Sequence, residues 1–163
     1  MSTTLCFADS GAGHFVPVAG WPEWTDLMQL ASRAHRSHQV MQAMVWYQQC
    51  VAMAIHALEG AADNQIEPAL EALVGASCCL ADLQEEEGAP ALAAQTRGEL
   101  HQRLVRQMCG ALSGRRRSVL ASFIHRTHSV LLAHVEAHGP DPAVMEGLRS
   151  GCMSLHAGHP PRH

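Results

Sequence analysis

Thiol, thioether and imidazole side chains gather near the C-terminal end of this 163-residue chain. The segment CMSLHAGHPPRH holds five such residues, which are Cys152, Met153, His156, His159 and His163. These groups suit copper(I), zinc or nickel, and the spacing from Cys152 to His156 can chelate an ion from one helical turn. We therefore predict Cys152, His156 and His159 as candidate ligands for zinc or copper, and expect no other cofactor. The alternative is a histidine-rich tail that binds metals only weakly.

Two more histidine pairs stand at chelating spacings further back in the chain. His125 precedes His128 by one helical turn, and His134 precedes His138 in the same way. On one continuous helix the two pairs point to nearly opposite sides, so they cannot build one site together. The alternative for both pairs is an ordinary solvated or hydrogen-bonded histidine.

Three consecutive arginines, Arg115, Arg116 and Arg117, form the strongest basic cluster. Guanidinium groups bind phosphate or carboxylate through paired hydrogen bonds. The chain has a net charge of −4, and no aromatic residues that could stack on bases are interleaved with the arginines. We therefore predict a surface that binds an acidic protein partner, or Glu85–Glu87 within or between subunits, and expect no nucleic acid.

The motifs of common catalytic sites are absent from the sequence. It contains no GxSxG, P-loop, GxGxxG or HExxH pattern, so we expect that the protein is not an enzyme. An uncharacterised enzyme is the third hypothesis, after an interaction module and a metal-handling protein. Six cysteines show no CxxC pair, which favours free thiols packed as small apolar groups.

The composition indicates one helical domain. Hydrophobic residues make up 47% of the chain, charged residues 16% and aromatic residues only 4%, which excludes disorder and favours helices over strands. The start of the chain lacks the pattern of a secretory signal, and no run approaches the ~18 apolar residues of a membrane span. We expect a cytoplasmic protein without a membrane partner.

Proline, glycine and apolar spacing divide the chain into predicted elements. Residues 1–20 should form an irregular arm, residues 21–153 a single helical domain and residues 154–163 a flexible histidine-rich tail. About six helices in antiparallel pairs are predicted, at 23–36, 40–60, 68–87, 91–112, 115–138 and 142–153. The fourth of these has an expected apolar side that includes Leu92 and Leu112, while Gly98 should weaken it locally.

The first two helices carry a recognisable spacing. Leu27, Leu30, Ala31 and Ala34 lie on one stripe, and Ala43 with Tyr47 follows in register. This pattern resembles the two helices of a tetratricopeptide (TPR) repeat, in a divergent, small bacterial-type form. The resemblance covers residues 24–58, lacks the proline that ends a standard repeat, and is poor beyond this range.

The resemblance implies a TPR-like stack of helical hairpins with a groove that holds a peptide or helix of another protein. An adaptor or chaperone-like interaction module is therefore the leading functional hypothesis. Metal handling through the C-terminal Cys, Met and His residues is the alternative. We also expect a homodimer, because a short helical stack leaves its terminal apolar faces uncovered.

Overall fold

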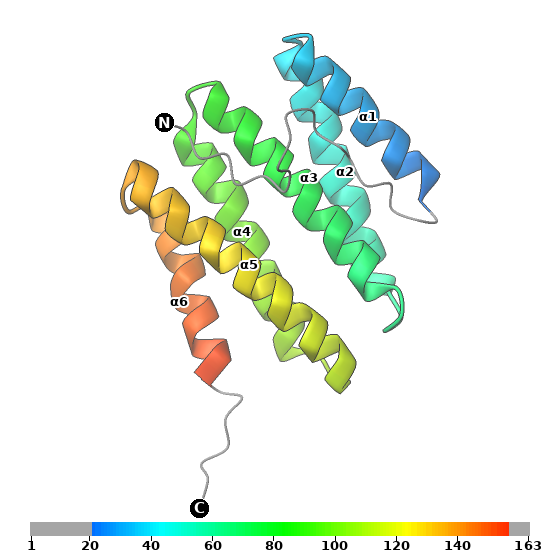
Figure 1. The fold of residues 1–163 in the computed structure, drawn as a ribbon, viewed down its shortest axis with the longest axis vertical. Helices are drawn as coiled ribbons and strands as arrows, with labels where there is room; N and C mark the ends of the chain where they lie inside the picture. The colour runs from blue at the N-terminus through cyan, green and yellow to red at the C-terminus, as the bar shows by residue number, and fades with distance from the viewer. Residues whose placement is uncertain (1–20, 157–163) are drawn as a thin grey trace, which may run out of the picture. The chain divides into compact units, whose positions relative to one another are not determined.

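A computed structural model describes the backbone of residues 21–156 and the side chains of residues 21–151. This part of the chain contains six helices and no strand, so the fold is all-α as predicted. The helices are α1 (Pro22–Arg36), α2 (Val40–Gly60), α3 (Ile66–Glu86), α4 (Pro90–Cys109), α5 (Gly114–His138) and α6 (Pro142–His156) (Figure 1). None of the described helices is long and apolar enough to cross a membrane. The predicted arm and most of the predicted tail lie outside the described residues.

The helices fall into two compact units, which meet in the sequence between Ala89 and Pro90. Unit 1 contains α1 to α3, and unit 2 contains α4 to α6. The amino-acid pattern predicts a single domain over residues 21–153. Two compact units are compatible with one or two folding domains, so the single domain stays a prediction.

In unit 1, α2 packs against both α1 and α3 (Figure 1). Small residues on the inner side of α2, such as Ala43, Cys50 and Ala54, are completely buried and let the neighbouring backbones approach closely. The indole Nε1 of Trp24 donates a buried 3.0 Å hydrogen bond to the carbonyl of Cys50. His35 Nε2 lies 2.8 Å from a carboxylate oxygen of Glu86, which links the ends of α1 and α3. The first contact joins α2 to α1, and the second joins α1 to α3.

In unit 2, α4 packs against α5 and α6. A buried apolar cluster of Ala94, Leu131 and Val144 takes one residue from each helix, with Val135 and Leu148 packed around it. The hydroxyl of Ser113 caps α5 by accepting a 3.0 Å hydrogen bond from the Arg116 amide. All three helices therefore share one small core.

Three leucines predicted on buried helical faces are exposed, so these expectations are wrong. Leu30 is 39% exposed on α1, and Leu92 is 50% exposed in the first turn of α4. Leu112 is 94% exposed, because α4 ends at Cys109 instead of continuing through Leu112. Ala31 and Ala34 face the core of unit 1 instead, together with Trp24 and Met28.

Candidate functional site

The structure gives only the backbone context of the predicted C-terminal metal ligands. Cys152 and His156 belong to the last turns of α6, and their side chains lie outside the described residues. His159 lies beyond the described backbone altogether. A zinc or copper site at these residues therefore stays a prediction.

Two of the three clustered arginines at the start of α5 stabilise the turn that precedes this helix. Arg117 donates a 2.8 Å hydrogen bond from Nε to the carbonyl of Ala111, and Arg116 donates one of 3.4 Å from Nη2 to Gln107. Arg115 and Arg117 are exposed, while Arg116 is half-buried. The structure brings the three residues to one helix end and gives two of them a role in the turn between α4 and α5. Binding of a partner there stays a prediction.

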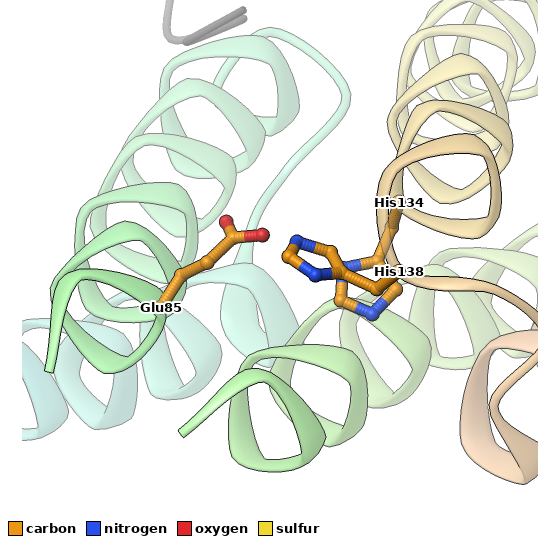
Figure 2. A group of neighbouring side chains, drawn as sticks. All are labelled: Glu85, His134 and His138. Atoms are coloured by element: carbon orange, nitrogen blue, oxygen red, sulfur yellow. The ribbon is translucent and has the colours of Figure 1, made fainter. Parts of the chain in front are cut away.

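The pair His134 and His138 forms a close contact on α5, as its four-residue spacing predicts. Figure 2 shows the two rings side by side, and their centroids are 4.7 Å apart. His134 is buried and His138 is exposed, and Glu85, also labelled in Figure 2, belongs to unit 1. Arg97 Nη1 lies 2.8 Å from His134 Nδ1. Arginine can only donate, so His134 Nδ1 accepts this hydrogen bond and its proton resides on Nε2.

The Arg97 contact bears on the chemistry of this pair. A guanidinium cation occupies the acceptor side of His134, where a metal ion would otherwise bind through Nδ1. The two rings lie close together, as the predicted chelate requires, but the guanidinium of Arg97 already places a positive charge beside His134. A structural hydrogen bond between α4 and α5 is therefore the role that its contacts support.

The ring neighbour of His128 is His101 of α4, instead of the predicted His125 on its own helix. The ring centroids of His101 and His128 are 5.7 Å apart, and the ring planes are tilted by 48°. His101 is completely buried, His128 is half-buried and His125 is exposed. No spacing within one helix indicates this pair, because His101 belongs to α4 and His128 to α5. His101 Nδ1 also lies 2.7 Å from Oγ1 of Thr127, the residue before His128.

Burial determines the charge of His101. Desolvation, followed by repulsion from His128, lowers the pKa of His101 from 6.5 to about 4. The imidazole is therefore neutral near pH 7. A neutral imidazole can accept a hydrogen bond or ligate a metal, which the protonated form cannot do.

Glycines let the helices of unit 2 approach closely around this pair. A Cβ added at Gly98 of α4 would lie 2.6 Å from the carbonyl oxygen of Ala143, and Gly98 lies against Gly147 of α6. A Cβ added at Gly151 would lie 2.5 Å from His101 Nε2. The Gly-x-x-x-Gly spacing of Gly147 and Gly151 was the sequence signal that could have indicated this contact. Gly98, expected to weaken α4, is the residue that makes room for α6.

The buried thiols of unit 1 are not suited to nucleophilic chemistry. Burial raises the pKa of Cys50 and of Cys79 to about 12, so both thiols are protonated near neutral pH. Cys50, Cys78, Cys79 and Cys109 are free thiols, as the sequence predicts. Of these four, Cys109 is the exposed one.

Residues 22–163 match the family described as protein of unknown function (DUF2753), and the chain belongs to this family. Comparison with curated proteins and with solved structures gives no match. The TPR resemblance stays a prediction.

Proposed function

We propose that the protein is a protein–protein interaction module in which the outward face of α2 binds another protein. One observation carries this proposal. From Val40 to Leu58, α2 has no aspartate, glutamate, lysine or arginine, although several of its residues are exposed. We call the exposed residues Met41, Val45, Gln48, Ala52 and His56 the α2 outer face.

The α2 outer face differs from an ordinary exposed helix surface. Such surfaces usually carry charged residues opposite the buried side. Here Met41 is 74% exposed and Val45 is 42% exposed, one helical turn apart. Exposed apolar side chains that adjoin one another favour association with another apolar surface. Docking on this face would desolvate no carboxylate, ammonium or guanidinium group, and desolvation of such groups opposes binding.

The inner side of α2 holds the outer face in place. Ala43, Cys50 and Ala54 are completely buried, and the carbonyl of Cys50 accepts the hydrogen bond of the Trp24 indole. A face presented on a fixed helix loses little conformational entropy when a partner binds. Methionine at position 41 adds a flexible side chain that adapts to different apolar surfaces.

The partner that fits this face is a peptide or helix with an apolar side. An amphipathic helix buries residues at three- and four-residue spacings, which matches the spacing of Met41, Val45 and Gln48 on α2. The TPR-like spacing of residues 24–58 supports the same class of partner. Gln48 can add a hydrogen bond to the partner backbone, since its amide both donates and accepts.

Charge placed on the α2 outer face tests the proposal. The double variant Met41→Glu/Val45→Glu and the wild type would be used to capture partners from the native cell, with recovery measured by quantitative mass spectrometry. We expect partner recovery to fall at least about tenfold in the double variant, because each glutamate would be desolvated on docking. Leu132→Glu, at a position 52% exposed on α5, adds one such charge elsewhere and should keep the partners.

Circular dichroism controls for folding. The helicity of the double variant should be unchanged, because both substituted positions are exposed. Equal recovery by the double variant and the wild type would reject the proposal. A wild-type dimer that becomes a monomer in the double variant by light scattering would also reject it, and would assign the face to self-association.

A further inference from the structure

Two imidazole nitrogens in unit 2 have no hydrogen-bond partner in the described part of the chain. They are Nε2 of His101, which is completely buried, and Nδ1 of His128. An unsatisfied buried polar atom destabilises the folded state, so native proteins rarely leave one without an ion or a water. Two such atoms on neighbouring rings point to a bound species.

The hydrogen bonds around Thr127 assign the proton of His101. Thr127 Oγ1 lies 3.0 Å from the carbonyl oxygen of Phe123 and 3.1 Å from that of Ile124. A carbonyl oxygen can only accept, so the hydroxyl proton of Thr127 is donated to the backbone. Oγ1 must then accept the 2.7 Å hydrogen bond from Nδ1–H of His101. This leaves a lone pair on His101 Nε2. The other nitrogen of the same ring, Nδ1, is held by the hydrogen bond that it donates, as in metal-ligating histidines.

The two unpartnered nitrogens converge beside Gly151. The position of a Cβ added at Gly151 lies 2.5 Å from His101 Nε2 and 3.5 Å from His128 Nδ1. The ring centroids are 5.7 Å apart. Two imidazoles that share one metal ion at 2.0–2.1 Å from each nitrogen have centroids roughly 5–6 Å apart. The separation of the rings therefore leaves the right spacing for one shared ion, although ordinary ring contacts also have it.

We propose that His101 Nε2 and His128 Nδ1 bind one zinc or copper(I) ion between α4 and α5. Neutral imidazole is a good ligand for both ions, whereas calcium and magnesium prefer oxygen. The proposed ligands are different residues from the predicted ligands Cys152, His156 and His159, and the proposal does not depend on the α2 outer face. A bound ion would satisfy both nitrogens and join α4 to α5 next to α6.

Titration of the metal-free full-length protein tests this site. Zinc would be added against a chromophoric competitor, and copper(I) would be added in the same way without oxygen. We expect one ion per chain, with His128→Ala weakening the affinity at least about tenfold. His125→Ala removes an exposed histidine from the same helix and should leave the affinity unchanged. His128 is half-buried, so its loss should leave the helices intact.

Nitrogen NMR of the imidazoles gives a second readout that does not depend on stability. Saturation with metal should shift the His101 Nε2 and His128 Nδ1 resonances and leave those of His125 in place. Equal affinity of His128→Ala and His125→Ala would overturn the proposal. Loss of binding in Cys152→Ser alone would also overturn it, because the ion would then belong to the C-terminal segment. A metal-soaked crystal with only a water between the two nitrogens would overturn it as well.

Discussion

Unit 1 and unit 2 bury different kinds of polar side chain. Both bury large apolar residues, such as Trp24 in unit 1 and Phe123 in unit 2. The buried polar residues of unit 1 are Ser77 and Gln84, whereas those of unit 2 are His101, Thr127 and His134. Buried apolar groups need only close packing, whereas buried imidazoles need partners. Among the described residues, the buried imidazoles all belong to unit 2.

The exposed sides of α2 in unit 1 and α5 in unit 2 also differ. The α2 outer face has no aspartate, glutamate, lysine or arginine, while the exposed residues of α5 include Arg115, Arg117 and Glu136. A fixed apolar core in unit 1 thus supports an apolar surface for docking. The two proposed roles, a protein-binding surface and a buried cation site, therefore belong to different units.

The largest expected difference between the two units is their loss of stability in acid, which should be greater for unit 2. The pKa of His101 lies at about 4 in the folded protein and near 6.5 when the chain is unfolded, so the unfolded state binds the proton first as the pH falls. The stabilising effect of the neutral imidazole is complete above about pH 6.5 and is lost as the pH falls to about 4. We expect a loss of about 3 kcal/mol in the metal-free protein.

Urea unfolding between pH 4 and pH 7 measures this loss. All three tryptophans, Trp21, Trp24 and Trp46, belong to unit 1, so their fluorescence reports that unit while circular dichroism reports both. The loss should appear in circular dichroism and be smaller in tryptophan fluorescence. His101→Leu removes the titrating group and should flatten the pH dependence. The same change of unfolding free energy with pH in the variant and the wild type would contradict this expectation.

Two glycine substitutions compare helix packing in the units. Gly98→Ala places a Cβ 2.6 Å from the backbone carbonyl oxygen of Ala143, which cannot move aside as a side chain can. We expect it to destabilise unit 2 by about 1–3 kcal/mol. Gly75 of α3 has no atom within 4 Å of an added Cβ, so Gly75→Ala should stabilise unit 1 by about 0.5–1 kcal/mol through its helix propensity.

Thermal unfolding followed by circular dichroism measures both variants. Opposite signs of the change in melting temperature would support close glycine packing in unit 2 and open space at Gly75. A neutral or stabilising Gly98→Ala would show that α6 does not need this close approach to α4.

The sequence predicted the helices well because proline and glycine mark their ends. Residues 40–60 were predicted as one helix, and α2 spans Val40–Gly60. Apolar spacing was less reliable for choosing the buried face. Leu30 and Ala31 are neighbours on the same predicted stripe, yet Ala31 is buried and Leu30 is not, because consecutive helical residues point about 100° apart and the buried face follows Trp24, Met28 and Ala31.

The candidate site could be predicted only in part. The contact between His134 and His138 follows from helical periodicity, because both residues are on α5. The pairing of His101 with His128 depends on how α4 packs against α5, and no spacing within one helix encodes it. The contact of Gly151 with His101 depends in the same way on the approach of α6 to α4.

Photo-crosslinking in the native cell tests the central claim most directly. A photoreactive phenylalanine analogue would replace Val45 on the α2 outer face, or Leu132 on α5 as the matched exposed control. The account predicts a discrete adduct with another protein from position 45, absent from position 132 and abolished by Met41→Glu. No adduct from position 45, or the same adducts from both positions, would contradict it.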